Sequence, residues 1–140
     1  MILKNIIYKD ELKKILIMIK KFENFNQEPE VKKDFYKNGQ KKYEEWLLNN
    51  KYHREDEPAR QGWHENGQKK YEEWFLNGKL HREDGPAYQE WYENGQKKYE
   101  YWYLNNKEYK KEDWIEMLKK INSSHYKEQK MLYDMEKYNL

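Results

Sequence analysis

The sequence predicts a mainly β protein, an antiparallel meander of three 28-residue hairpin repeats with α-helices at both ends. Residues 38–46 recur unchanged at 66–74, and recur at 94–102 with Tyr101 in place of a glutamate. Each copy begins with Asn-Gly between two strand-like runs. Units repeated at a fixed spacing stack to bury a shared core, and Asn-Gly is a strong signal for a tight hairpin. These two observations favour a β-hairpin array over other folds.

Aromatic residues compensate for a very polar composition. Of the 140 residues, 39% are charged and 17% are aromatic, including 14 Tyr and 6 Trp, and the mean hydropathy is −1.51. Large rings bury much area per residue and can build a thin core. The net charge is only +2, whereas nucleic-acid-binding domains are typically strongly basic. Because the chain has no cysteine, it has no disulfide and no thiolate metal site.

Residues 1–27 are expected to form an N-terminal helical cap. Their apolar residues recur at three- and four-residue spacing, on one helix face: Tyr8, Leu12, Ile15, Leu16, Ile19 and Phe22. The dense apolar run at 15–19 is too short for a signal peptide or a membrane-spanning helix. We therefore expect no membrane span and a cytoplasmic location.

Residues 28–110 are expected to form the β array. The Asn-Gly pairs are predicted to be two-residue type I′ turns with positive φ at both residues: Asn38-Gly39, Asn66-Gly67 and Asn94-Gly95. A second turn follows eleven residues later in each copy: Asn49-Asn50, Asn77-Gly78 and Asn105-Asn106. Each copy then reads as strand, turn, long strand, turn, short strand and loop.

Fixing the turns sets the cross-strand register. The predicted structural pairs are Trp46 with His53, Glu45 with Arg54, Trp74 with His81, Glu73 with Arg82, and Trp102 with Tyr109. Counting around Asn66-Gly67 also places Arg60 opposite Glu73, which would lie between Arg60 and Arg82. Such pairs stabilise a sheet by about 0.2–1 kcal/mol each. Alternation places the tryptophans of the repeated motif on one face and its tyrosines on the other.

Residues 111–140 are expected to form a C-terminal helical cap. One helix carries a stripe of Trp114, Ile115, Leu118 and Ile121, and a second short helix carries Leu132, Met135 and Tyr138. An array of this kind needs end caps because an unpaired edge strand invites association.

The hairpin sequences resemble a known family. The segments 91–95, 74–78 and 81–87 (Trp-Tyr-Glu-Asn-Gly, Trp-Phe-Leu-Asn-Gly and His-Arg-Glu-Asp-Gly-Pro-Ala) are similar to MORN-like repeats, variants of the membrane occupation and recognition nexus. The last of these is similar to repeats in uncharacterised proteins of giant DNA viruses, phages and some bacteria. The resemblance covers about residues 30 to 110. It implies the hairpin architecture and, for a viral chain, a location in the host cytoplasm or the virion.

The function predicted from these observations is a non-catalytic scaffold that binds another protein or a second copy of the chain. Repeat arrays offer an extended surface, and large rings make good anchors. The candidate interaction surface is Trp63, Tyr88, Trp91 and Tyr92. The main alternative is a nucleic-acid-binding module, in which single strands stack on the strand aromatics beside the lysine pairs at 41–42, 69–70 and 97–98.

Two further functions are disfavoured by the sequence. The His-Arg-Glu-Asp motifs at 53–56 and 81–84 cluster a histidine with acids, but each histidine and arginine already has a predicted structural partner. We therefore predict no catalytic residue, metal site, cofactor or small-molecule substrate. Aromatic hairpin repeats also occur in choline- and glucan-binding cell-wall modules, which a chain without a secretion signal does not favour.

Overall fold

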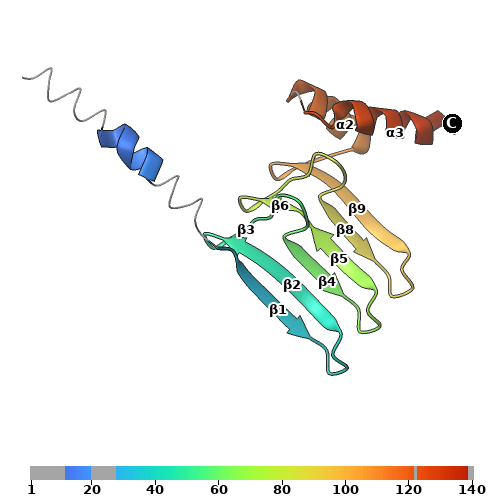
Figure 1. The fold of residues 1–140 in the computed structure, drawn as a ribbon. Helices are drawn as coiled ribbons and strands as arrows, with labels where there is room; N and C mark the ends of the chain where they lie inside the picture. The colour runs from blue at the N-terminus through green and yellow to red at the C-terminus, as the bar shows by residue number, and fades with distance from the viewer. Residues whose placement is uncertain (1–11, 20–27, 122, 139–140) are drawn as a thin grey trace, which may run out of the picture.

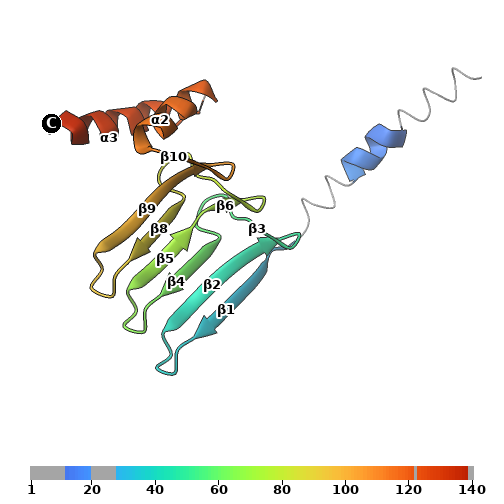
Figure 2. The ribbon, with the colours of Figure 1, turned by 180° about the vertical axis from the view of Figure 1, so that it is seen from behind.

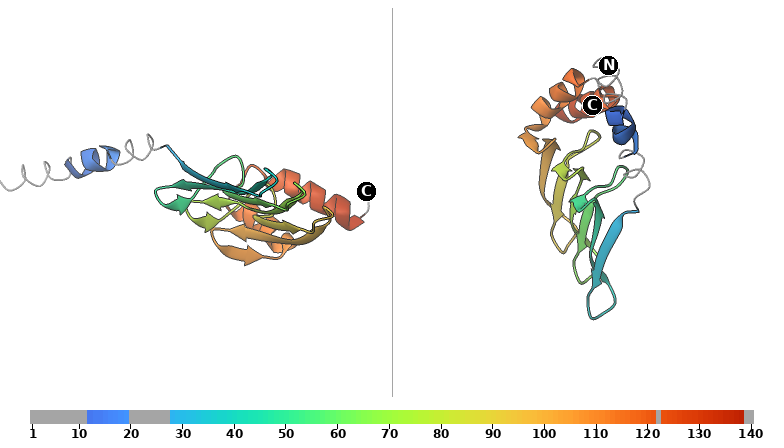
Figure 3. Two further views of the ribbon diagram at one scale, coloured as in Figure 1. Left: turned by 90° about the horizontal axis from the view of Figure 1, so that it is seen from below. Right: turned by 90° about the vertical axis from the view of Figure 1, so that its left-hand side faces the viewer.

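The computed structural model describes residues 12–19, 28–121 and 123–138. Over these residues the protein is mainly β, with one antiparallel meander sheet, a short two-stranded ribbon and three helical segments (Figure 1). The sheet is a single twisted layer (Figure 3), and the C-terminal helices lie beyond one end of its strands.

The strands follow one another across the sheet in chain order. Their bounds are β1 Glu30–Phe35, β2 Lys41–Leu48, β3 Lys51–Tyr52, β4 Arg60–Trp63, β5 Lys69–Glu73, β6 Phe75–Leu76, β7 Lys79–Leu80, β8 Tyr88–Trp91, β9 Lys97–Leu104 and β10 Lys107–Tyr109. The sheet order is β1-β2-β4-β5-β8-β9-β10, with β3 paired to β2, while β6 and β7 form the ribbon. Figure 2 shows this succession from behind.

The second turn of each copy has the predicted conformation. The φ values are positive at both central residues: Asn49 53°, Asn50 58°, Asn77 53°, Gly78 77°, Asn105 52° and Asn106 68°. Positive φ at both positions marks a type I′ turn, and asparagine adopts it more readily than most residues. The predicted register follows, with Phe75 opposite Leu80 and Leu76 opposite Lys79.

The Asn-Gly turns differ from the prediction. The Gly39 N–H donates to the Tyr36 carbonyl at 3.0 Å, and the Tyr36 N–H donates to the Gln40 carbonyl at 2.8 Å. Only the glycine has positive φ, at 84°. The loop is therefore a three-residue turn with glycine in the left-handed position, rather than a two-residue type I′ turn. The same backbone bonds recur in the second and third copies, around Gly67 and Gly95.

A register shift beside each of these turns brings the strands back to the predicted pairing. The shifts fall between Asp34 and Phe35, between Gly62 and Trp63, and between Glu90 and Trp91. Beyond the second shift, Arg60 pairs with Glu73 as predicted. The sequence thus predicted the strand register but not the way the first turn of each copy is built.

The two faces of the sheet carry different rings. Directly opposed residues share a face, and successive residues alternate between faces. One side, the tyrosine face, carries Tyr43, Tyr71, Tyr88, Tyr99 and Tyr101. The other side, the tryptophan face, carries Trp46, Trp63, Trp74, Trp91 and Trp102. Because charged residues accompany the rings on both faces, neither face is a dry core.

The most apolar core lies where the C-terminal helices meet the sheet. These helices are α2 (Lys111–Lys120) and α3 (Tyr126–Tyr138). Trp114, Ile115 and Leu118 of α2 are buried against Leu104 of β9, which confirms the predicted stripe at those three positions. Ile121, at the end of the stripe, is 45% exposed. The three predicted apolar residues of α3 are also exposed: Leu132, Met135 and Tyr138.

Residues 12–19 form a helix whose side chains are all exposed. These include Leu12, Ile15, Leu16 and Ile19, which were predicted to share one apolar face. Tyr8 and Phe22 lie outside the described residues, so the N-terminal cap over residues 1–27 stays a prediction. No helix in the described part of the chain is long and apolar enough to cross a lipid bilayer.

Candidate functional site

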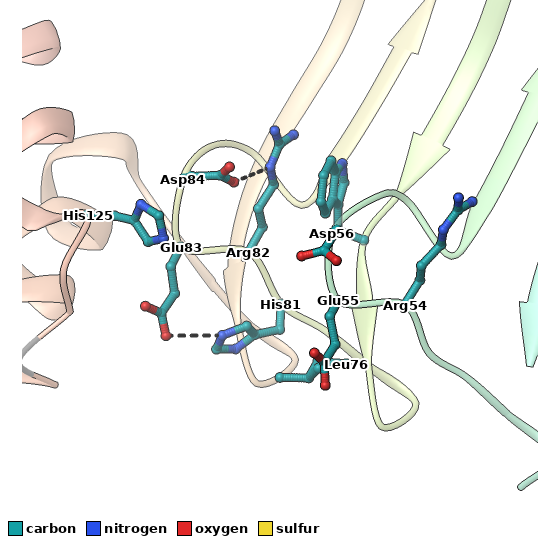
Figure 4. Close-up of a pocket in the computed structure, with 10 residues that line it drawn as sticks. Arg54, Glu55, Asp56, Leu76, His81, Arg82, Glu83, Asp84 and His125 are labelled. Carbon is teal, nitrogen blue, oxygen red and sulfur yellow. Dashed lines mark hydrogen bonds and ion pairs between the residues drawn. The ribbon is translucent and has the colours of Figure 1, made fainter. Parts of the chain in front are cut away.

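A concave site lies between the two His-Arg-Glu-Asp loops and the segment that links α2 to α3 (Figure 4). This loop pocket has a volume of about 300 Å³. The residues that line it are Arg54, Glu55, Asp56, Trp74, Leu76, His81, Arg82, Glu83, Asp84 and His125. It combines imidazole, guanidinium and carboxylate groups, so the partners of each group decide what the pocket can do.

Each loop reaches the pocket by leaving its own hairpin one residue after the histidine. The His81 N–H still donates to the Trp74 carbonyl at 3.0 Å, as the predicted register requires. The next N–H, of Arg82, donates instead to the Tyr103 carbonyl of the following copy at 3.2 Å. The first copy does the same, with Arg54 bonded to Phe75 at 3.1 Å. The loops therefore join neighbouring copies.

Both ring nitrogens of the loop histidines face other protein groups. His53 Nδ1 accepts the Asn77 backbone N–H at 3.0 Å, and His81 Nδ1 accepts the Asn105 N–H at 3.2 Å. An acceptor at Nδ1 places the ring proton on Nε2 in the neutral imidazole. The Nε2 atom of His81 lies 3.4 Å from a Glu83 oxygen (Figure 4).

The loop arginines lie over tryptophan rings. The Arg82 guanidinium is 3.8 Å from the centroid of Trp74, and its Nε donates to Asp84 at 2.6 Å. It lies 3.8 Å from Glu72 rather than against Glu73, so the predicted Glu73–Arg82 pair is wrong. The alternation of side chains along a strand does not predict the partner of Arg82, because Arg82 has already left the strand.

The first copy repeats this arrangement. The Arg54 guanidinium is 4.1 Å from the centroid of Trp46 and pairs with Glu57. It lies 3.9 Å from Glu44, so the predicted Glu45–Arg54 pair is also wrong. In the third copy, Trp102 pairs with Tyr109 as predicted.

Glu45 and Glu73, which do not contact the loop arginines, both bind Arg60. Its Nε donates to Glu45 at 3.0 Å and its Nη1 to Glu73 at 2.5 Å. Burial raises the pKa of Glu73 above its ordinary value, although Arg60 opposes the shift. Glu73 is therefore partly buried, and its arginine partner is Arg60. It does not lie between two arginines as predicted.

The polar groups of the pocket do not form a nucleophilic relay. Ser123 Oγ donates to Glu83 at 2.7 Å, and Glu83 also faces His81 Nε2. A serine nucleophile needs an imidazole next to its hydroxyl, whereas here the carboxylate lies between serine and histidine. Among the described residues, no group of three His, Cys, Asp or Glu side chains is placed to hold a metal ion.

The structure does not bring the four predicted interaction residues onto one surface. Tyr88 lies on the tyrosine face, with its ring centroid 5.7 Å from that of Tyr101. Trp63 and Trp91 lie on the tryptophan face, where Lys41 and Lys69 lie over their rings at 4.9 and 5.9 Å. Tyr92 is in a turn and is 50% exposed.

The tyrosine face carries a cluster of tyrosines that the sequence did not predict. A shallow depression of about 300 Å³ is lined by Leu80, Tyr88, Glu90, Tyr99, Tyr101 and Tyr103. Tyr99 and Tyr101 stack at 6.3 Å between centroids and are 48% and 38% exposed. The signal for this cluster was Tyr101, the single change in the third copy of the repeated motif.

The Tyr88 hydroxyl, at the rim of this cluster, has a raised pKa. Burial and the hydrogen bond from Tyr88 Oη to Glu90 raise the pKa of Tyr88 to about 12. Hydrogen bonds from Lys98 and Tyr88 lower the pKa of Glu90. The Glu90 carboxylate beside these rings therefore already has two hydrogen-bond partners, Tyr88 and Lys98.

Comparison with protein-family models, with curated proteins and with solved structures finds no match to this chain.

Proposed function

We propose that this chain is a non-catalytic repeat scaffold of the MORN-like type, which acts by binding protein chains. In this proposal residues 28–110 form three copies of one hairpin unit, with helical caps before and after them. The support is a set of contacts that recur every 28 residues. The lysine that begins each long strand pairs with a glutamate three residues later: Lys41–Glu44, Lys69–Glu72 and Lys97–Glu100.

The observation that carries the proposal is the position of the exposed aromatic rings. In the strands and turns, aromatic residues at least 38% exposed lie at the two sides of the array: Phe35 at one side, and Tyr92, Tyr99 and Tyr101 at the other. Exposed rings grouped on an otherwise charged surface mark sites of protein association. The charged groups of the loop pocket, in contrast, contact one another and the tryptophan rings.

The resemblance of the loop sequence to repeats of giant-virus and phage proteins supports a place in viral assembly. The proposed location is the host cytoplasm or the virion.

Nucleic-acid binding is the second candidate, and the stacked rings of Tyr99 and Tyr101 are the observation that favours it. The recurring lysines argue against it. Lys41, Lys69 and Lys97 each lie within 2.7 Å of a glutamate oxygen, so much of their charge is already compensated within the array.

The two functions are separated by one preparation of the full chain. Chemical cross-linking in a lysate of the producing cells, followed by mass spectrometry, should capture a protein partner or a second copy. A variant with Tyr99→Ser and Tyr101→Ser should lose the capture, whereas Met131→Ser on α3 should keep it. A chain that captures no protein and does not self-associate would overturn the scaffold proposal.

The same preparation tests nucleic-acid binding. Fluorescence anisotropy with a labelled single-stranded oligonucleotide should show weak binding by the full chain. Tight binding that falls steeply with salt, together with a high 260/280 absorbance ratio after low-salt purification, would establish the second candidate instead.

A further inference from the structure

We propose that the protein partner is a second copy of this chain, whose β1 docks beside β9 and extends the sheet head to tail. This inference rests on the scaffold function proposed above and names its partner. Both edges are open in the described structure. β1 pairs with β2 alone, and residues 99–101 of β9 pair with β8 alone, because β10 pairs only with 102–104.

The exposure of Val31 marks the open edge of β1, which has no second neighbouring strand among the described residues. Val31 is 28 residues before Ala59, which is 28 before Ala87, and both alanines are 0% exposed. Val31 is 39% exposed. Each alanine carbonyl accepts an N–H at 2.8 Å from a tryptophan of the preceding strand, Trp46 or Trp74. The neighbour that Val31 lacks is therefore a strand of the β2 and β5 type. In β9 the equivalent tryptophan, Trp102, already pairs with Tyr109 of β10, so the docked contact is limited to residues 99–101.

β9 is the third strand of that type, and its sequence fits β1 in the same register. In the first junction Tyr43 pairs with Gly62 and Glu44 with Gln61; in the second, Glu72 pairs with Gln89. A shift by 28 residues gives the third junction. Tyr99 of one chain would face Asp34 of the other, Glu100 would face Lys33, and Tyr101 would face Lys32.

The charges at this junction are complementary. Glutamine stands opposite the glutamate in both internal junctions, whereas the open edge of β1 offers Lys33 to Glu100, which would then be shared between Lys33 and its present partner Lys97. Tyr101 replaces the glutamate of the first two copies and would receive the ammonium group of Lys32 over its ring. An opposite-charge pair and a cation–π contact both favour association across strands.

The turns offer two more contacts. Asn38 Nδ2 donates to the Glu65 carbonyl at 2.9 Å, and Asn66 Nδ2 donates to the Glu93 carbonyl at 2.9 Å. The equivalent Asn94 is left with its own neighbour Gln96, at 3.3 Å. In a docked pair its Nδ2 would reach the carbonyl of Lys37.

The residue at the Tyr36 position of the first two turns also contacts a backbone carbonyl of the following copy. Tyr36 Oη donates to the Trp63 carbonyl at 2.9 Å, and His64 Nε2 lies 3.0 Å from the Trp91 carbonyl. Tyr92, their equivalent, is 50% exposed. Docking would give its hydroxyl the carbonyl of Phe35, and Lys97 would cover the Phe35 ring as Lys41 covers Trp63. Such an interface uses different surfaces on the two chains, so it can propagate into longer oligomers.

Disulfide trapping tests the register directly because the natural chain has no cysteine. Full-length Asp34→Cys chains are mixed with full-length Tyr99→Cys chains under mild oxidation. We expect about tenfold more mixed disulfide than when Lys33→Cys replaces Asp34→Cys, since a one-residue offset turns the side chain to the opposite face. Equal trapping by both mixtures would overturn the proposal.

Exchange of the charges at Lys33 and Glu100 tests how strongly this pair contributes to the association of two chains. Sedimentation velocity of the natural chain should show oligomers that grow with concentration. Lys33→Glu should raise the dissociation constant about tenfold, and addition of Glu100→Lys should restore association. Lys33→Gln, which installs the residue of the internal junctions, is the matched control and should weaken association much less.

The outcomes separate this inference from the scaffold function. A natural chain that stays monomeric at its highest soluble concentration overturns head-to-tail docking. If that monomer still captures another protein in the cross-linking experiment, the scaffold function stands. Self-association that is indifferent to Lys33→Glu also overturns the proposed interface.

Discussion

His81 Nδ1 accepts a hydrogen bond from the backbone N–H of Asn105, 24 residues further along the chain, at 3.2 Å. His53 makes the same contact with Asn77 at 3.0 Å. Each histidine therefore fixes the first residue of the next type I′ turn. The acceptor lone pair explains why an imidazole occupies a position that looks catalytic in the sequence: the ring links neighbouring copies.

Loss of this acceptor should weaken the array. His81→Ala should lower the free energy of unfolding by about 0.5–1.5 kcal/mol, because the Asn105 N–H loses its partner. His81→Asn should cost less, since its side-chain oxygen can accept the same N–H. Urea unfolding followed by tryptophan fluorescence measures both. Equal losses for the two variants would show that ring packing, not the hydrogen bond, is what matters.

Gly62 is covered by the ring of Tyr71. A Cβ at this position would overlap that ring, with Tyr71 Cδ1 only 2.8 Å away. Gly62→Ala should therefore displace the tyrosine and lower the free energy of unfolding by about 2 kcal/mol. Adding Tyr71→Ala should make the two costs less than additive, because the clash is gone. Chemical denaturation of the two single variants and the double variant completes the cycle.

Gly39 supplies the control for backbone strain alone. Its φ is 84°, and nothing lies within 4 Å of a Cβ built there. Gly39→Ala should cost about 1 kcal/mol from the left-handed conformation. A cost for Gly62→Ala no greater than this would contradict the ring-overlap explanation.

Glu44 and Glu73 should give opposite pH dependences of stability. Burial raises the pKa of Glu44, but hydrogen bonds from Lys41 and Trp46 outweigh it and lower the pKa below 4.5. Its stabilising contribution is present above pH 4.5 and is lost as the pH falls through the lowered pKa. The pKa of Glu73 is raised above 4.5 by burial. Its contribution is full below pH 4.5 and is lost as the pH rises through the raised pKa.

Glutamine substitutions separate the two signs. Glu44→Gln should destabilise the protein more at about pH 6 than at about pH 3, whereas Glu73→Gln should become less destabilising as the pH rises. Urea unfolding at a series of pH values between these limits measures both. Parallel profiles for the two variants would contradict the opposite environments of these carboxylates.

The strand order and register were predictable because the turn chemistry is local. Asn77 and Gly78 of the second turn both adopt positive φ, and this type I′ turn sets the pairing of Phe75 with Leu80. Asn38-Gly39 is ambiguous, since glycine alone at positive φ also satisfies the pattern. The Asn38 side chain accepts the Gln40 N–H at 3.0 Å and so supports the three-residue form. Nothing in the sequence selects between the two turns.

The partners of the arginines were not predictable from alternation. Arg82 leaves its strand because its N–H bonds to Tyr103 in the following copy, which is a contact between units. The same change of direction places its guanidinium on Trp74 and leaves Glu73 to Arg60. Sequence counting holds within a hairpin and fails where the chain passes between hairpins. The loop pocket forms at that passage.

Trp114 should test whether α2 supports the end of the array. The side chain is 0% exposed, packs with Leu104, Ile115 and Leu118, and its Nε1 donates to the Arg82 carbonyl at 3.2 Å. Trp114→Ala should cost about 3–5 kcal/mol, and Trp114→Phe should cost less because it keeps an aromatic ring in the core while it loses the hydrogen bond and part of the ring volume. In a stacked array each unit is stabilised by its neighbours. Hydrogen exchange should therefore accelerate most in β9 and β10 and least in β1 and β2. Uniform acceleration along all strands would instead mean that the sheet unfolds as one unit and that α2 supports no particular end of it.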